Sequence, residues 1–377
     1  MSRRNLPGTF WPSALQEQLL TVALGDPAAA VATWETLAPR FALDDLERGS
    51  FELLPLIYRN LTRGGGEDPV LPRLKGIYRK TWVANNLLVE RTKETGEALR
   101  TGRIPALFVE GAVIAERFYP ELGLRPTSSV DVLVEDPDCT RALVQLADTG
   151  WRERPGSVKG SGAIRYLSDE GGNVLVLRTT LAIDFVARAG GARSHTPLWE
   201  AAEQRTIGGV ELLVPAPTDT LLAVCVSHAR AGGGPSTQWI ADAKMLLDTE
   251  IDWERLLAIG VERGQTSRLR DVFRYLASLP GARPPQSVSE RLAGTRTTSR
   301  ERFIYRCTAG SIRRPGALPS LAAEHLAATR DESWLRTIVT FPRHLRDRWN
   351  LSRSWHVPFA AGRRTIRLLA ARRRGSA

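Results

Sequence analysis

Two aspartates stand inside short apolar, strand-like runs of this sequence. Asp131 lies in Val130-Asp-Val-Leu-Val134, and Asp184 lies in Leu181-Ala-Ile-Asp-Phe-Val186. A carboxylate among apolar residues is costly unless it is paired with a cation or bound to a metal. Two converging carboxylates can hold a divalent metal on a triphosphate. The pattern therefore predicts metal-assisted phosphate chemistry.

A glycine ahead of the first aspartate fits the same chemistry. Gly111 follows an apolar run at residues 104–109, and a helix is expected at residues 112–118. Glycine lets the backbone approach a phosphate closely, and the N–H groups at the start of a helix bind anions. We therefore expect a phosphate group to lie at the Gly111 turn.

Each aspartate also has a structural explanation that involves no metal. Asp131 can be a strand-end or turn residue that pairs with Arg125, and Asp184 can be a charge on an edge strand. Both aspartates follow Gly111 in the order of strand, turn and strand that a phosphate site needs. This order favours the joint site as the main hypothesis.

The elements around these residues predict a small mixed sheet. Strands are expected at residues 104–109, 130–134, 164–167, 174–177 and 181–186, and helices at residues 112–118 and 138–150. Apolar and β-branched residues dominate the strands, and the helices carry their apolar residues on one face. This alternation predicts an α+β unit over residues 103–215.

Helical regions flank the predicted sheet on both sides along the chain. Apolar residues recur at helical spacing in residues 13–24, 28–43, 53–61 and 74–99, and again in 219–229, 239–247, 253–262 and 267–279. Glycines or prolines follow several of these segments and predict where the helices end. We expect an N-terminal helical region (1–102), a C-terminal helical region (216–333) and an arginine-rich tail (334–377).

Five motifs occur in consistent order between about residue 15 and residue 285. The central one comprises Phe108-Val-Glu-Gly-Ala-Val-Ile-Ala-Glu-Arg-Phe-Tyr-Pro120 and Gly123-Leu-Arg-Pro-Thr-Ser-Ser-Val-Asp-Val-Leu-Val134. It resembles the pattern L-K-G-A-x-L-A-x-x-x-Y-P … R-P-x-x-D-I-D-L-L-V of a family of bacterial nucleotidyltransferases in the polymerase-β-like superfamily. The helical signatures of that family resemble four more segments, at residues 53–61, 219–228, 239–242 and 251–253.

The resemblance implies a nucleotidyltransferase-like mixed sheet that transfers a nucleotidyl group from a nucleoside triphosphate to a hydroxyl-type acceptor. In that family a D-x-D pair and a third acidic residue hold Mg²⁺. The second Asp of the pair falls on Asp131 and the third carboxylate on Asp184, which are the expected catalytic residues and metal ligands. The residues expected to contact the nucleotide are Gly111, Arg125, Ser128 and Ser129.

Three positions depart from the family pattern. Ser129 stands where the family has the first Asp of the pair, and Glu110 stands where it has Lys. Phe185-Val-Ala187 occupies the segment in which the family often has His. Two hypotheses follow. Either Glu110 joins Asp131 and Asp184 as a metal ligand, or the protein is a pseudoenzyme that acts as a non-catalytic partner.

Two further polar residues occur in the C-terminal helical region. His228 ends an apolar helix, where a packed or capping role is the usual one. The glycines after it, in Ala231-Gly-Gly-Gly-Pro235, predict a loop that can cover a site. Asp242 is expected to pair with a neighbouring Lys or Arg.

Cysteine usage and hydropathy indicate a cytoplasmic protein. The three cysteines, Cys139, Cys225 and Cys307, are widely spaced and form no C-x-x-C pair. This argues against a disulfide framework and a structural zinc site. The sequence predicts neither a signal peptide nor a membrane-spanning helix.

The net charge of +11 is concentrated at the C-terminus. Residues 335–377 contain 11 arginines and one carboxylate, Asp347, so the rest of the chain is close to neutral. A groove that tracks phosphates would need a basic body, so no specific nucleic-acid role is expected. Residues 363–374 can form a basic amphipathic helix that lies on an anionic membrane or binds an acidic partner. The alternative is a solvated terminus.

Overall fold

The computed structural model describes most of the chain. The described residues are 11–40, 42–155, 164–179, 196–227, 236–310, 318–329, 333–349 and 351–363. The strand expected at residues 181–186, with Asp184, and His228 with the loop at 231–235 lie outside the described residues. So does the amphipathic segment expected at 363–374, apart from its first residue.

The N-terminal region is helical, as the spacing of its apolar residues predicts. Its helices are α1 (Ala14–Leu24), α2 (Pro27–Leu37), α3 (Arg48–Phe51), α4 (Leu54–Arg63) and α5 (Leu71–Thr101). A capping box starts α1, because the Ser13 hydroxyl accepts from the backbone N–H of Gln16 and the Gln16 side chain accepts from the N–H of Ser13. The Asp26 side chain caps the N-terminus of α2, and Pro27 occupies the first position of that helix.

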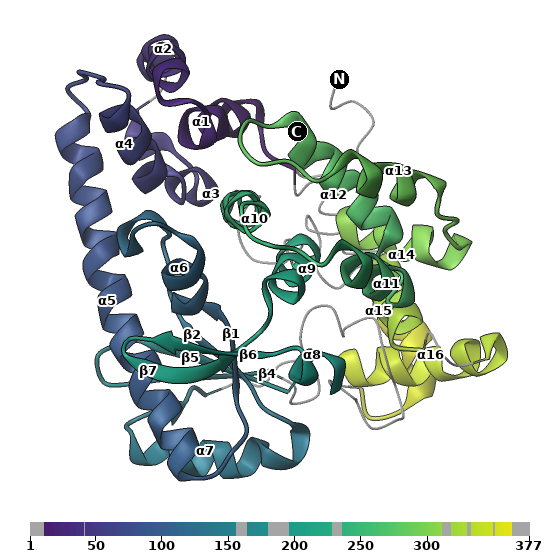
Figure 1. The fold of residues 1–377 in the computed structure, drawn as a ribbon. Helices are drawn as coiled ribbons and strands as arrows, with labels where there is room; N and C mark the ends of the chain where they lie inside the picture. Colours follow the sequence, from purple (N-terminus) through teal and green to yellow (C-terminus); the bar gives the residue numbers. More distant parts are fainter. Residues whose placement is uncertain are drawn as a thin grey trace.

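The middle of the chain forms a five-stranded mixed sheet with the order β1-β2-β5-β4-β3. The strands are β1 (Leu107–Gly111), β2 (Val130–Leu133), β3 (Arg152–Glu153), β4 (Ile164–Ser168) and β5 (Val174–Arg178). β2 and β5 are parallel, and the other pairs are antiparallel. Two helices connect the strands, α6 (Ala112–Phe118) and α7 (Cys139–Asp148). The predicted α+β fold class is confirmed (Figure 1).

A separate β-hairpin follows the sheet and was not expected from the sequence. After the short helix α8 (Thr196–Glu200), β6 (Glu203–Ile207) pairs with β7 (Val210–Val214). Gly208 and Gly209 both have positive φ, at 57° and 83°, as a two-residue hairpin turn requires. β7 lies against β1, and the hairpin also contacts α5.

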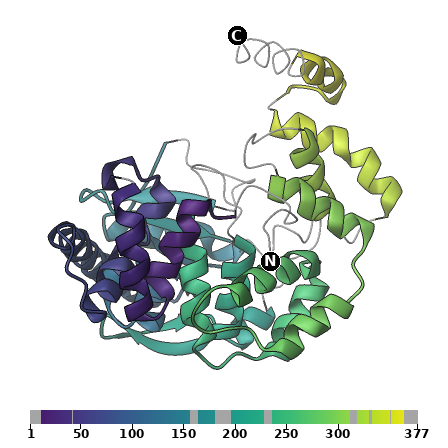
Figure 2. The ribbon, with the colours of Figure 1, turned by 90° about the horizontal axis from the view of Figure 1, so that it is seen from above.

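The rest of the described chain is helical. Its helices are α9 (Pro217–Ser227), α10 (Gln238–Leu247), α11 (Trp253–Glu262), α12 (Thr266–Ser278), α13 (Gln286–Gly294), α14 (Ser299–Gly310), α15 (Leu318–Ala328) and α16 (Trp334–Arg348), with a last helical segment at residues 357–363. Figure 2 shows α15 and α16 to one side of the N-terminal helices. Within the part of the chain that the structure describes, no helix is long and apolar enough to cross a bilayer.

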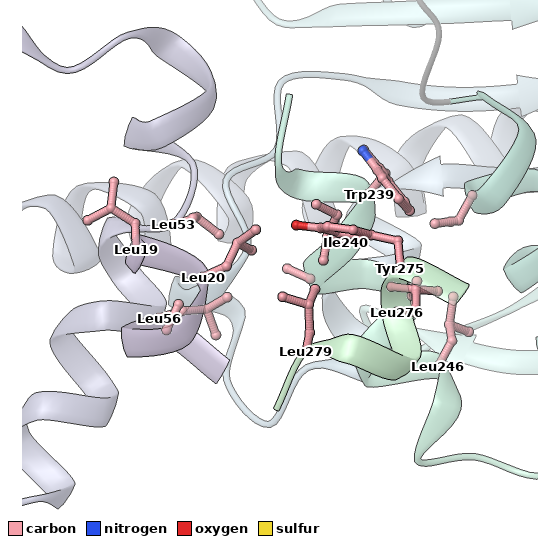
Figure 3. Close-up of a cluster of buried hydrophobic side chains, with 14 of the residues drawn as sticks. Leu19, Leu20, Leu53, Leu56, Trp239, Ile240, Leu246, Tyr275, Leu276 and Leu279 are labelled. Carbon is pink, nitrogen blue, oxygen red and sulfur yellow. The ribbon is translucent and has the colours of Figure 1, made fainter. Parts of the chain in front are cut away.

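The N-terminal and C-terminal helices share one hydrophobic core although the sheet separates them in the sequence. Leu19 and Leu20 of α1 and Leu56 of α4 face apolar side chains of α10 and α12, including Ile240 and Leu276 (Figure 3). A second cluster lies under the sheet and includes side chains from the C-terminal half of α5 and from the hairpin. Thus α5 contributes to both hydrophobic clusters, and the N-terminal and C-terminal helices pack together beside the sheet.

Candidate functional site

The Gly111 turn lies at the end of β1, as expected from the sequence. Its φ is +70°, a conformation that other residues rarely adopt. A Cβ atom at this position would lie 2.2 Å from the carbonyl oxygen of Ser129. The close approach of β1 to the chain entering β2 therefore requires glycine here. The expected contact between Gly111 and a phosphate stays a prediction.

Asp131 lies on β2, between β1 and β5, and is almost completely buried. Its side chain is 3% exposed. The hydroxyl of Ser129 donates a hydrogen bond of 2.6 Å to its Oδ2 atom. Its Oδ1 atom accepts from Arg178, from Nε at 3.2 Å and from Nη2. Both oxygens of this carboxylate are thus bonded within the protein.

Arg178 is the residue that the sequence interpretation missed. It ends β5, the strand parallel to β2, and the register places Asp131 opposite Val176, two residues earlier. Side chains two residues apart on a strand share a face, so Arg178 projects on the side of Asp131. The one available signal was an arginine directly after Val174-Leu-Val-Leu177, because a charge at the end of a buried strand needs a counter-charge.

The charge of Arg178 is held by two carboxylates. The Arg178 side chain is 2% exposed. Its Nη2 atom contacts the Asp131 carboxylate and also lies 3.5 Å from Oε2 of Glu110. Burial by itself lowers the pKa of a guanidinium. The charges of Glu110 and Asp131 outweigh that effect and raise the pKa of Arg178 above its ordinary value. The site therefore contains a permanent positive charge.

Glu110 points toward the same place as Asp131. The two residues are partners across the antiparallel β1–β2 ladder, next to an irregularity between Phe108 and Glu110. The Glu110 side chain is about one-quarter exposed (26%). It therefore lies at the edge of the site, whereas Asp131 lies in the interior. The structure thus brings Glu110 and Asp131 together, as the rearranged-site hypothesis requires, but Arg178 contacts both.

Arg125 takes part in a different buried network. Its Nε and Nη2 atoms donate to the two carboxylate oxygens of Asp242 on α10, at 2.7 and 2.8 Å. The interpretation that Arg125 pairs with Asp131 is therefore wrong, because Asp242, 117 residues after Arg125, binds the guanidinium. Asp242 pairs with an arginine, as expected, but its partner Arg125 comes from a distant part of the chain and not from a neighbouring residue. Arg125 Nη1 also donates to the carbonyl of Gly111, at 3.2 Å.

Two neighbours complete the Asp242 network. The Tyr119 hydroxyl donates to Asp242 Oδ1 at 2.8 Å, and the Gln238 amide donates to the same oxygen at 3.1 Å. Burial and the charge of Asp242 raise the pKa of Tyr119 well above its ordinary value. The network connects the loop before β2 to the C-terminal helices. It fixes the position of this loop, which leads to Ser129.

The other expected contact residues lie around the entrance to β2. Ser128 is exposed, and Ser129 is partly buried with its hydroxyl directed to Asp131. Ser129, Glu110 and Gly111 therefore surround Asp131, whereas Arg125 contacts the site through the Gly111 carbonyl. The position of Asp184 relative to them stays a prediction.

Groups of the protein itself occupy the oxygens of Asp131 at which a divalent metal is expected, and Asp184, the third expected ligand, lies outside the described residues. Among them, no group of three or more His, Cys, Asp or Glu side chains has metal-binding geometry. A cation at Asp131 would have to displace the Arg178 guanidinium from Oδ1 and the Ser129 hydroxyl from Oδ2. Glu110 and Asp131 carry two negative charges, and Arg178 neutralises one of them. The geometry therefore places an internal cation next to these carboxylates.

Comparison with known proteins gives two partial likenesses. The chain is 33% identical over 138 residues to UDP-N-acetylenolpyruvoylglucosamine reductase 2 of Symbiobacterium thermophilum, over 35% of this chain and 44% of that protein. The chain thus spans less than half the length of this curated relative. The crystal structure of an antigenic nucleotidyltransferase-like protein from Paracoccidioides brasiliensis matches 52% of this chain and 94% of that chain, with 14% identity and a TM-score of 0.32. At this TM-score no residues can be equated.

A family model covers more of the chain. The model, described as an uncharacterised nucleotidyltransferase, matches residues 51–281. The match includes the whole sheet, the Gly111 turn, Asp131 and the Asp242 network, and it ends after α12. With more than half of its length matched, the chain belongs to this family of uncharacterised nucleotidyltransferases.

Proposed function

We propose that this protein is a non-catalytic member of its nucleotidyltransferase family, an accessory or binding protein built on the family fold. The observation that carries the proposal is the occupation of both Asp131 oxygens by Arg178 and Ser129. A metal-binding carboxylate has to present its oxygens to the ion, and the metal supplies several kcal/mol of the transition-state stabilisation. Here the oxygens are bonded within the protein.

The chemistry of the neighbouring positions supports the same conclusion. Ser129 replaces an anionic ligand with a hydroxyl that donates toward Asp131. Val176 stands level with Asp131 on the parallel strand and offers no ligand. Arginine remains protonated at all ordinary pH values, so Arg178 keeps its positive charge beside Asp131. Glu110, at the edge of the site, is left beside the same guanidinium.

Calorimetric titration of the full chain with Mg²⁺, with each nucleoside triphosphate and with both together tests the proposal. We expect no magnesium-dependent nucleotide binding, and no release of pyrophosphate on incubation with any triphosphate. Magnesium-dependent binding that disappears in Asp131→Asn and Glu110→Gln would instead support the rearranged metal site with Glu110, Asp131 and Asp184. In that case the protein would be a transferase acting on a nucleoside triphosphate and an acceptor.

A restoring variant makes the test sharper. Ser129→Asp combined with Arg178→Ala removes the internal cation and provides a second carboxylate at the D-x-D position. We expect this double variant to bind Mn²⁺ where the natural chain does not, because only the variant has two carboxylates at the D-x-D position and lacks the Arg178 cation beside them. Arg165→Ala is the matched control, since Arg165 pairs with Glu153 at the opposite side of the same sheet. If the double variant folds and gains no metal binding, Arg178 is not what excludes the ion.

A further inference from the structure

Exposed apolar side chains gather in the last described part of the chain. Thirteen large apolar side chains are exposed among the described residues, and six of them lie between residues 334 and 359. These are Trp334 (62% exposed), Leu335 (76%), Ile338 (54%), Val339 (74%), Trp355 (60%) and Phe359 (69%). We call these six side chains the terminal apolar face. This face lies outside the family match, which ends at residue 281.

Helix α16 carries an apolar stripe that is packed toward its C-terminal end and exposed toward its N-terminal end. One side packs against α15, where Leu345 joins a small core with Leu321, Trp349 and Val357. Successive helical residues are rotated by about 100°, so the four exposed apolar residues, all near the N-terminal end of α16, share one sector, and the packed Leu345 falls in the same sector further along the helix. A surface helix of a globular domain normally has one apolar stripe, facing its core. The exposed N-terminal part of this stripe needs an environment other than water.

Positive charges predominate after the start of the terminal apolar face, although Asp331 and Glu332 directly precede Ser333 and Trp334. Between residues 335 and 363 the sequence has six arginines and one acidic residue, Asp347. Asp347 is already paired with Arg346, its neighbour on α16. Arg336 and Arg343 follow the apolar sector around the helix, and Arg353 precedes Trp355. The sequence adds five more arginines between residues 364 and 374.

We propose that the terminal apolar face binds the surface of an anionic lipid bilayer. Apolar side chains of an interfacial helix enter the boundary between headgroups and acyl chains, while arginines beside them contact lipid phosphates. Tryptophan suits this boundary, and Trp334 and Trp355 both belong to the face. Figures 1 and 2 show α16 at the edge of the molecule, where a flat surface can reach it.

The charge pattern decides between the lipid surface and a second copy of the chain. A symmetric dimer through this face would place two clusters of arginines against each other, and like charges in contact oppose association. An anionic bilayer offers the opposite charge and an apolar phase at the same surface. The binding mode is peripheral, because four of the six residues lie along the side of α16 in one sector.

Co-sedimentation of the full chain with lipid vesicles tests the proposal. We expect binding to vesicles of phosphatidylcholine mixed with phosphatidylglycerol, weaker binding to phosphatidylcholine alone, and a loss of binding as salt increases. Ile338→Asp combined with Val339→Asp should weaken binding at least about tenfold, since burying one such side chain changes an equilibrium constant by about that factor. Val144→Asp on α7 is the matched control, because Val144 is 65% exposed and lies outside the face.

Two further variants separate the face from the residues that follow it. A chain that ends at Arg363 should still bind the mixed vesicles, though more weakly, because it keeps the terminal apolar face and loses five arginines. The double variant Arg343→Glu/Arg353→Glu should reduce binding to the mixed vesicles and leave the weaker binding to pure phosphatidylcholine vesicles unchanged. The proposal is wrong if the shortened chain loses all binding while the Ile338→Asp/Val339→Asp variant binds normally. It is also wrong if light scattering shows a dimer that this variant abolishes and no vesicle binding is seen.

Discussion

The Arg178 guanidinium and the Asp131 carboxylate form an ion pair between neighbouring parallel strands, with each side chain almost fully buried. A buried charge without a partner is far more costly than a buried pair. Each residue therefore needs the other in order to remain charged inside the sheet. The ion pair stabilises the sheet, and it also occupies the Asp131 oxygen that would otherwise be open to another ligand.

Replacing Arg178 by Met should lower the free energy of unfolding by about 3–5 kcal/mol, because Asp131 is left buried and uncompensated. Urea unfolding followed by tryptophan fluorescence measures the change. Arg165→Met is the control on the same sheet. Its partner Glu153 is partly exposed, so we expect a loss of less than about 1 kcal/mol.

The double variant Arg178→Met/Asp131→Leu completes a thermodynamic cycle. Removing both charges together should recover most of the stability that Arg178→Met loses, since apolar residues of similar volume often replace a buried ion pair at little cost. An Arg178→Met variant as stable as the Arg165→Met control would show that the pair does not hold Asp131 inside the sheet.

The sequence predicted those elements that local patterns determine. The helix expected at residues 112–118 and the one expected at residues 253–262 have those bounds in the structure. Capping residues and helical periodicity act within a few residues of each other, so one segment contains the whole signal. The β6–β7 hairpin was missed because β6 reads Glu-Gln-Arg-Thr-Ile, with only Ile207 buried. A mostly exposed polar strand has no apolar alternation to detect.

The site was predicted only in part because its contacts depend on strand register. Sequence order placed Gly111, Glu110 and Asp131 near one another, and the antiparallel β1–β2 pairing confirms that. The partner of Asp131 comes from β5, and only the parallel register with β2 puts Arg178 beside it. The Arg125–Asp242 pair joins residues 117 apart. Nothing local in the sequence specifies such pairs.

Gly111→Ala should lower the free energy of unfolding by about 3 kcal/mol or more. A side chain in this backbone conformation costs about 1–3 kcal/mol by itself, and the added Cβ would overlap the Ser129 carbonyl oxygen. Gly76→Ala in α5 is the control, because no atom lies within 4 Å of its added Cβ and alanine favours the helix by up to about 1 kcal/mol. Opposite shifts in the urea midpoint are expected, and equal shifts would contradict the close approach of β1 to Ser129.

The Asp242 network predicts a graded response to mutation. Asp242→Asn leaves the buried guanidinium of Arg125 without a counter-charge and should cost about 3–5 kcal/mol. Tyr119→Phe removes one hydrogen bond to the carboxylate and should cost about 1.5–3 kcal/mol. Denaturant unfolding of the two variants gives the order directly. The reverse order would mean that the hydroxyl, not the ion pair, holds the loop before β2 to α10.

His344 on α16 should make the C-terminal helices sensitive to acid. Burial, helped by nearby His325 and Arg348 and opposed by Asp347, lowers the pKa of His344 from 6.5 to about 4. Between these two pH values the unfolded chain binds a proton that the folded chain does not, so the folded state loses stability as the pH falls through that window. Each pKa unit corresponds to about 1.4 kcal/mol. Because part of the ring faces solvent, we expect a total loss of about 1–2 kcal/mol.

His344→Gln removes this proton uptake and should reduce the loss of stability between neutral pH and about pH 4.5, measured by urea unfolding at both values. Titration of the His344 ring by NMR gives an independent measurement of its pKa. A ring that titrates at its ordinary pKa would contradict the buried contact between His344 and His325, whose ring centroids lie 5.1 Å apart. In that case acid would not loosen the packing of α16 on α15 through this residue, because both states would bind the proton equally.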